Sequence, residues 1–217
     1  MSTQQACRSD EMIISNVQAV LLAAGASSRY GDDKLLAELI INGTKQSVIC
    51  HTLTNWLAVF DNIIVMVRRG HIQLQNHLEG RFDKGKIQLV VADDADLGMG
   101  HSIAAGVNKS SDSEGWIIGL ADMPLIPSSV IQSVCSALMK GALIAVPVRE
   151  QRRGHPVGFA RRYEEQLLAL KGDTGAKAVI TENRADVTQI PSTTDSIFYD
   201  IDKPSDLVNA PQFIAAN

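Results

Sequence analysis

The sequence contains little of what a secreted, membrane-spanning or nucleic-acid-binding protein requires. Cysteine accounts for three of its 217 residues, and no two cysteines have C-x-x-C spacing, so no disulfide framework is indicated. No apolar run reaches the roughly 18 residues of a membrane-spanning helix. The net charge is -4, so a basic surface for nucleic acid is not expected. We therefore expect a cytoplasmic protein with reduced thiols and neither a nucleic-acid nor a membrane partner.

The N-terminal region also lacks the apolar stretch of a secretory signal. Residues 1–15 are polar, and we expect them to form a flexible N-terminal extension. Hydrophobic residues make up 45% of the chain, which is enough for a buried core. Because no repeat, linker or low-complexity tract interrupts the rest, residues 16–217 are predicted to form a single domain.

Apolar runs and amphipathic segments alternate along this domain. The runs typical of buried strands are residues 17–23, 62–67, 86–91, 116–121 and 142–148. Helical spacing is found at residues 47–60, 71–78, 102–108, 128–139, 161–170 and 174–181. Weaker strand signals lie at residues 187–190 and 197–199, and a turn that makes a small hairpin or a bend is expected at Asn42–Gly43. The alternation predicts an α/β fold with a parallel sheet and right-handed crossovers.

The first strand ends in a segment suited to polyphosphate. Gly25 and Ser27 interrupt the apolar run, and Arg29 and Lys34 follow. Glycine lets backbone N–H groups approach phosphate oxygens, arginine binds two oxygens at once, and lysine supplies a mobile charge. The segment is neither a P-loop nor a G-x-G-x-x-G fingerprint. An ordinary strand-to-helix turn with a solvated arginine and lysine is the alternative.

Acidic residues follow two later segments of the chain. Asp122 ends the run 116–121, and ligands in open α/β sheets lie beyond the carboxyl ends of strands. A carboxylate there suits Mg²⁺, which prefers carboxylates, phosphate oxygens and water, although Asp122 could instead cap a helix. Asp200 and Asp202 alternate around Ile201, so an extended backbone would place them on one side.

Several of these segments resemble one family. Residues 22–34, Leu-Ala-Ala-Gly-x-Ser-x-Arg-x-Gly-x-x-Lys, resemble the triphosphate-binding signature of the MobA-like NTP-transferase family, with Tyr30 in place of the usual Met. Residues 120–124 and 200–204 resemble the two segments that hold the family's metal, and residues 98–102 resemble the segment beside base and ribose. The Leu-Ala-Ala-Gly form resembles the branch of the molybdenum cofactor cytidylyltransferases.

Two further motifs resemble the acceptor-binding segments of that branch. They are Arg-Gly-His-Pro-Val at residues 153–157 and Leu-Lys-Gly-Asp-Thr-Gly-Ala-Lys at residues 170–177. Arg153, His155 and Lys177 could donate to a pterin and its phosphate, and Asp173 could accept from pterin N–H groups. Lys177 stands where the branch usually has arginine, so the charge is kept but the bidentate contact is lost.

The resemblance implies a Rossmann-like three-layer sandwich with a mostly parallel sheet, like that of nucleotide-diphospho-sugar transferases. The implied activity is Mg²⁺-dependent transfer of CMP from CTP to molybdopterin or its molybdenum form, with release of pyrophosphate. The alternatives are a related transferase with another nucleotide or acceptor, and a non-catalytic molybdopterin carrier or insertion factor. A molybdenum hydroxylase or its maturation factor would then be a partner.

The resemblance also implies a set of site residues. The catalytic residues would be Arg29, Lys34 and Asp122, and the metal ligands Asp122 and Asp202. The nucleotide-binding residues would be Leu22, Ala23, Ala24, Gly25, Ser27, Arg29, Lys34, Gly98, Gly100 and Ser102. The acceptor-binding residues would be Arg153, His155, Asp173 and Lys177.

Overall fold

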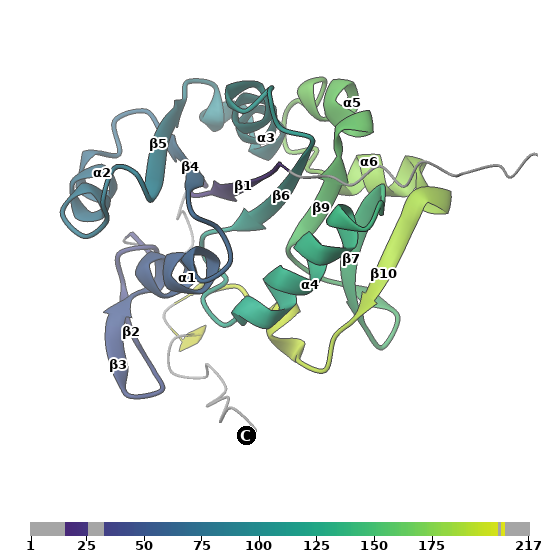
Figure 1. The fold of residues 1–217 in the computed structure, drawn as a ribbon. Coiled ribbons are helices and arrows are strands. Elements are labelled where there is room, and N and C mark those ends of the chain that lie inside the picture. Colours follow the sequence, from purple (N-terminus) through teal and green to yellow (C-terminus); the bar gives the residue numbers. More distant parts are fainter. Residues whose placement is uncertain (1–15, 26–32, 204, 207–217) are drawn as a thin grey trace, which may run out of the picture.

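An eight-stranded mixed sheet forms the centre of the fold (Figure 1). The computed structural model describes residues 16–25, 33–203 and 205–206, so the predicted N-terminal extension lies outside the described residues. The sheet order is β10-β7-β9-β6-β1-β4-β5, and β8 pairs with β7. The strands are β1 (Val17–Leu22), β4 (Ile63–Arg68), β5 (Ile87–Ala92), β6 (Gly115–Leu120), β7 (Ile144–Arg149), β8 (Arg152–Arg153), β9 (Val157–Ala160) and β10 (Val187–Pro191).

Most neighbouring strands are parallel, as the sequence predicts. The four strands β6, β1, β4 and β5 form one parallel group, and β7 and β10 form a second parallel pair. Strand β9 joins the two groups by running antiparallel to both β6 and β7. The carboxyl ends of β1, β4 and β6 therefore meet at one edge of the sheet, which is where ligands bind in open α/β sheets.

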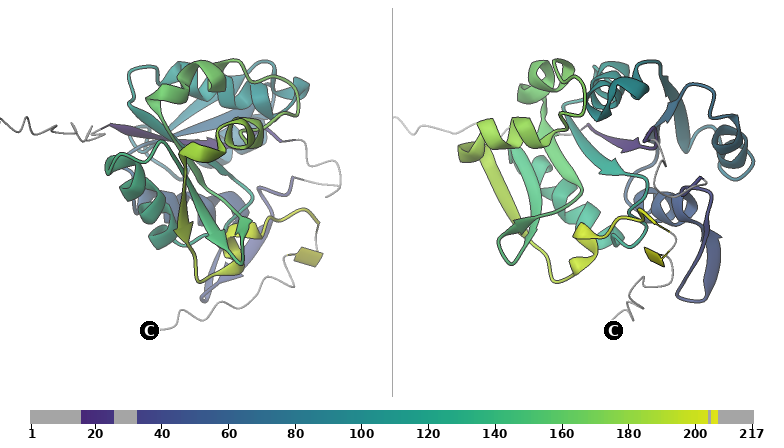
Figure 2. Two further views of the ribbon diagram at one scale, coloured as in Figure 1. Left: turned by 90° about the vertical axis from the view of Figure 1, so that its right-hand side faces the viewer. Right: turned by 180° about the vertical axis from the view of Figure 1, so that it is seen from behind.

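Helices cover both faces of the sheet (Figure 2). They are α1 (Val48–Leu57), α2 (Ile72–Glu79), α3 (Met99–Lys109), α4 (Ser128–Met139), α5 (Glu164–Leu168) and α6 (Lys177–Glu182). Alternate residues of β1 face opposite ways: Ala19 and Leu21 pack in one core with α1, α2 and α4, and Val20 and Leu22 in the other with α3, α5 and α6. The predicted three-layer α/β sandwich is thus confirmed.

A small hairpin precedes α1, and its turn is one that the local sequence is enough to predict. Strands β2 (Glu38–Ile41) and β3 (Thr44–Ser47) are antiparallel, and Asn42 and Gly43 connect them with φ of 50° and 77°. Asn-Gly is the pair that a two-residue turn with positive φ favours, so the predicted turn is confirmed. Ser47 caps α1 by accepting a hydrogen bond from the backbone N–H of Cys50 at 3.4 Å.

Several predicted boundaries or element types differ from the structure. The sequence predicts an extended segment at residues 197–199, but Asp195–Phe198 forms a 3₁₀ helix because the Thr194 side chain accepts from the Ser196 N–H. Helix α3 begins three residues earlier than predicted, directly after Gly98. Short 3₁₀ segments also occur at Ala95–Leu97, Arg161–Tyr163 and Arg184–Asp186. Among the described residues, no helix is both long and apolar enough to cross a bilayer.

Candidate active site

A cavity of about 420 Å³ lies at the carboxyl ends of β1 and β6. Backbone hydrogen bonds continue the sheet into this region, from Ala23 N to Met66 O at 2.9 Å and from Ala121 N to Leu22 O at 3.0 Å. The predicted site residues that line the cavity are Leu22, Ala23, Ala24, Gly25, Lys34, Gly98, Ser102, Asp122, Asp173 and Asp202. Ser27 and Arg29 lie outside the described residues, so their predicted contacts with phosphate stay predictions.

Three carboxylates converge in this cavity. One oxygen from each of Asp122, Asp200 and Asp202 lies within 4.8 Å of the others. The segment that carries the last two is tied to β6, because the backbone N–H of Ile201 donates to the Asp122 carbonyl at 2.9 Å. Asp206 supports the same segment, since its carboxylate accepts from the backbone N–H groups of Asp202 and Lys203. Asp200, which the sequence analysis did not assign to the metal, thus joins the two predicted ligands.

The electrostatics of this cluster favour a bound cation. Oδ1 of Asp122 is buried and makes no hydrogen bond within the described part of the chain. Burial raises the pKa of Asp200, and the neighbouring charges of Asp202 and Asp122 raise it further. Three carboxylates that repel one another, one of them with a buried oxygen that no described residue hydrogen-bonds, form a donor set that suits a divalent cation such as Mg²⁺.

Lys34 lies directly on this cluster. Its Nζ is 2.6 Å from Oδ2 of Asp122 and 3.0 Å from Oδ1 of Asp202. Burial lowers the pKa of Lys34, but the charges and hydrogen bonds of the two aspartates outweigh this effect, so the pKa is raised overall. The ammonium group, predicted to contact phosphate, thus also partly neutralises the carboxylates predicted to hold the metal.

The glycine segment at the start of α3 packs against the loop 170–175. Gly98 has φ of 118°, and a Cβ there would lie 2.2 Å from the backbone carbon of Gly172. Gly100 N donates to Gly172 O at 2.8 Å, and Gly172 N donates to Nδ1 of His101 at 3.2 Å. Gly98 and Gly100, which the resemblance assigns to the nucleotide, thus bring their backbone close to the chain's own loop. His101, which the sequence analysis left unassigned, helps to hold that loop.

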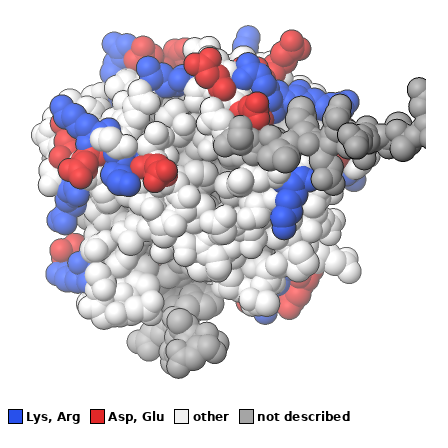
Figure 3. Space-filling model, viewed as in Figure 1, with Lys and Arg blue, Asp and Glu red and all other residues white. Residues whose placement is uncertain are grey.

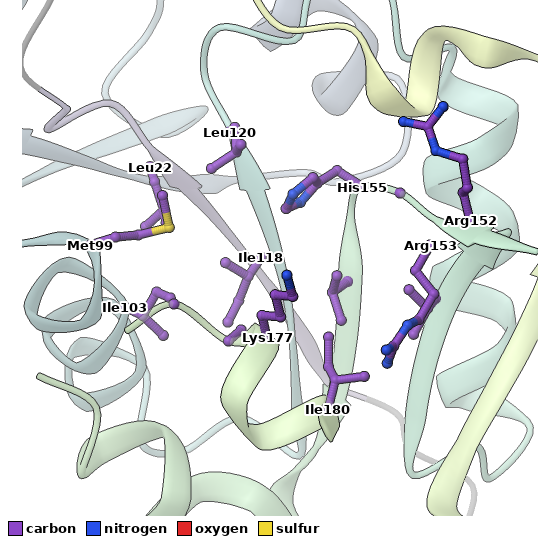
Figure 4. Close-up of a pocket in the computed structure, with 15 residues that line it drawn as sticks. Leu22, Met99, Ile103, Ile118, Leu120, Arg152, Arg153, His155, Lys177 and Ile180 are labelled. Atoms are coloured by element: carbon purple, nitrogen blue, oxygen red, sulfur yellow. The ribbon is translucent and has the colours of Figure 1, made fainter. Parts of the chain in front are cut away.

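A second cavity, of about 430 Å³, adjoins the first (Figure 4). It brings together Arg153, His155 and Lys177, and the side chains of His155 and Lys177 point toward its middle. The remaining lining is mostly apolar, with Arg152 as a further cation. Asp173 does not line this cavity and lies in the first one. Since Leu22, Met99 and Leu120 line both cavities, the two are contiguous.

His155 is held rigidly at the wall of the second cavity. Its backbone N–H donates to Ile197 O at 3.0 Å, which ties it to the 3₁₀ helix Asp195–Phe198. Nδ1 of the ring is buried and has no hydrogen-bond partner in the described part of the structure. Burial lowers the pKa of His155, although the Asp200 carboxylate acts in the opposite direction. The ring is thus a neutral polar group turned toward a mostly apolar space.

Positive charge is not gathered on the face of the molecule seen in Figure 3. Lys and Arg side chains lie among Asp and Glu side chains there, mostly around its rim. The described residues of this face form no continuous basic area of the kind that binds nucleic acid.

Comparison with known proteins shows the family. Residues 19–187 match the MobA-like NTP transferase domain. The chain belongs to this family. It is 28% identical over 194 residues to the purine catabolism protein PucB of Bacillus subtilis (strain 168), which is 86% of this chain and 92% of that protein. It is 27% identical over 154 residues to a 2-C-methyl-D-erythritol 4-phosphate cytidylyltransferase of Shewanella oneidensis, which is 68% of this chain and 59% of that protein.

The fold is also that of solved structures. Rv0371C of Mycobacterium tuberculosis, in complex with manganese, superposes with a TM-score of 0.72 at 20% identity, over 90% of this chain and 97% of that one. The family and fold predictions are therefore confirmed, and family membership supports nucleotidyltransferase activity.

Proposed function

We propose that this protein transfers CMP from CTP to the terminal phosphate of a molybdopterin-type acceptor, with Mg²⁺ as the cofactor. An acceptor phosphate oxygen attacks the α-phosphorus in line, the bond to the β-phosphate oxygen breaks, and pyrophosphate leaves. The observation that carries the proposal is the position of the acidic cluster and Lys34, beside a second, mostly apolar cavity with basic residues. Such transfer needs mainly positioning and charge neutralisation, which these residues can supply.

Asp122, Asp200 and Asp202 would hold the metal. Oδ1 of Asp122, which no described residue hydrogen-bonds, is the clearest sign of this role, because a buried carboxylate oxygen without a partner is costly. When bound, Mg²⁺ would polarise the α-phosphate and neutralise developing charge. The same cluster argues against a non-catalytic carrier, since a carrier has no need for a metal–triphosphate site.

The nucleotide side is formed by Gly25, Lys34 and Ser102. A Cβ added at Gly25 would meet no atom of the described residues within 4 Å, and Gly25 lines the cavity. Phosphate oxygens could approach the backbone closely at this position. Lys34 would turn from the carboxylates to the β- and γ-phosphates when the metal arrives, and it would stabilise the leaving pyrophosphate. Ser102 is buried beneath the same cavity.

The acceptor side is the second cavity. Its apolar walls suit the faces of a fused ring, and Arg153 and Lys177 could bind an attached phosphate. His155 is placed to hydrogen-bond the edge of the ring. Asp173 lies on the nucleotide side of the junction, so its expected contact with the pterin would require the ring to reach that junction.

The choice of nucleotide and acceptor is supported by motifs and relatives. The Leu-Ala-Ala-Gly form, the Arg-Gly-His-Pro-Val motif and the loop 170–177 resemble the molybdenum cofactor cytidylyltransferases, and the Shewanella relative is named a cytidylyltransferase. A related transferase with another nucleotide or acceptor is the second candidate. The recipient of the product stays a prediction.

The deciding experiment compares CTP, GTP and ATP. Calorimetry with Mg²⁺ would measure the affinity for each nucleotide, and pyrophosphate release would be followed with and without molybdopterin. We expect the tightest binding for CTP and release that depends on molybdopterin. Preference for GTP or ATP would overturn the assigned nucleotide, and release that molybdopterin does not accelerate would overturn the assigned acceptor.

A further inference from the structure

We propose that His71 is a positioning residue for Lys34 and acts through Asp33. The inference rests on the proposed function, because the nucleotide role of Lys34 belongs to that function. Nε2 of His71 lies 2.5 Å from Oδ2 of Asp33, and the two side chains are only 10% and 12% exposed. Neither residue was singled out by the sequence, where His71 is only the first residue of a short predicted helix.

Asp33 closes a tight turn around Lys34. While Oδ2 of Asp33 contacts His71, Oδ1 accepts a hydrogen bond from the backbone N–H of Leu35 at 3.2 Å. The Asp33 carbonyl also accepts from the backbone N–H of Leu36 at 3.0 Å. These contacts are made by the residues immediately before and after Lys34, so they determine the direction in which its Cα–Cβ bond points.

The anchor for this turn is β4 and the turn that follows it. His71 lies in the turn after that strand, and its backbone N–H donates to the carbonyl of Arg68 at 3.4 Å. The carbonyl of Met66, also in β4, accepts from the Ala23 N–H. Ala23 is thus tied to β4 itself and Asp33 to the turn after β4, and these two residues lie near the two ends of the segment 22–34 that resembles the triphosphate-binding signature.

The contact also separates two neighbouring charges. Asp33 is a carboxylate directly before Lys34 in the sequence, so it could compete with Asp122 and Asp202 for the Lys34 ammonium. His71 engages the carboxylate of Asp33, and the ammonium of Lys34 contacts Asp122 and Asp202 instead. Without the ring, the carboxylate would lose a buried partner and the turn would lose its tie to β4. We expect Lys34 to be misplaced as a result.

The test is a pair of matched histidine substitutions. His71→Phe keeps a ring but removes the contact with Asp33, and His71→Gln keeps an N–H donor. His77→Phe is the control, because His77 lies in α2, which begins directly after His71, and its Nε2 is 2.9 Å from Oγ of Ser47. Calorimetry with Mg²⁺ would measure affinity for CTP and CMP, and thermal melts would report the stability of each variant.

We expect His71→Phe to weaken CTP binding about tenfold and to change CMP binding by less than about twofold, since in the proposed function Lys34 would contact phosphates that CMP lacks. His71→Gln should restore most of the loss, and His77→Phe should bind CTP like the wild type. In a Lys34→Met background, His71→Phe should cost no further affinity, because the residue through which it acts is already gone.

Three results would overturn the inference: unchanged CTP affinity in a folded His71→Phe protein, equal losses for CTP and CMP, or an additional loss in the Lys34→Met background. If His71→Phe does not fold, Asp33→Asn takes its place in the same cycle, and a loss that adds to that of Lys34→Met overturns the inference equally. A Lys34→Met protein that binds every nucleotide triphosphate normally would instead overturn the proposed nucleotide site itself.

Discussion

Replacing Lys34 by methionine should affect metal and nucleotide in opposite directions. The ammonium lies 2.6 Å and 3.0 Å from two of the three carboxylates that would hold the metal. Any cation that enters the free protein must therefore compete with Lys34. Two unit charges about 4 Å apart interact by about 4 kcal/mol at an effective dielectric constant near 20.

The gain in cation-binding free energy from removing the Lys34 charge is smaller than this value. The Asp202 side chain is 44% exposed, so water screens its interaction with Lys34, while Asp122 is only 17% exposed. We expect Lys34→Met to strengthen divalent-cation binding in the absence of nucleotide by about 1 to 3 kcal/mol, which is roughly 5-fold to 150-fold in affinity. The same substitution should weaken CTP binding and affect CMP much less.

Mn²⁺ titration followed by electron paramagnetic resonance would measure the first effect, and calorimetry would measure the second. Lys45→Met is the matched control, because Lys45 pairs with Glu38 at 2.6 Å on the exposed hairpin. That control should leave Mn²⁺ affinity unchanged. If Lys34→Met binds Mn²⁺ no more tightly than the wild type, the carboxylates that Lys34 contacts are not the metal ligands.

Three further predictions test the rest of the site. The Asp122→Ala protein should melt within a few degrees of the wild type, but its activation free energy for transfer should rise by several kcal/mol. The rate of pyrophosphate release at saturating Mg²⁺ measures this rise, and near-normal turnover would refute the role of Asp122 as a metal ligand. Gly25→Ala should fold normally and bind CTP more weakly, whereas Gly98→Ala should lower the melting temperature itself because of its contact with Gly172; normal CTP binding by Gly25→Ala would mean that phosphate does not approach there. Burial lowers the pKa of His155, so the neutral ring contributes stability above the ordinary histidine pKa of about 6.5, and this stability is lost as the pH falls below that value. His155→Gln should therefore flatten the pH dependence of urea unfolding in that range. The same substitution should weaken molybdopterin binding but not CTP binding.

Local sequence was enough to predict the elements whose causes are local. The apolar run at residues 17–23 predicted β1, Asn42–Gly43 predicted the hairpin turn, and the helical spacing that starts at Ser47 predicted where α1 begins. Asp122 could be placed at the edge of the sheet because a strand pattern ends beside it. Each of these conclusions depends on backbone geometry and burial over fewer than about ten residues.

Only the tertiary structure decided which side chains share a site. Lys34 contacts Asp122 and Asp202 across 88 and 168 residues of sequence, and no pattern along the chain encodes such distances. Three other features likewise depend on contacts between segments far apart in the sequence. They are the antiparallel position of β9 between β6 and β7, the position of Asp200 beside Asp122 and Asp202, and the contact between His71 and Asp33. Strand order brings these segments together, and strand order depends on packing of the whole sheet rather than on any one segment.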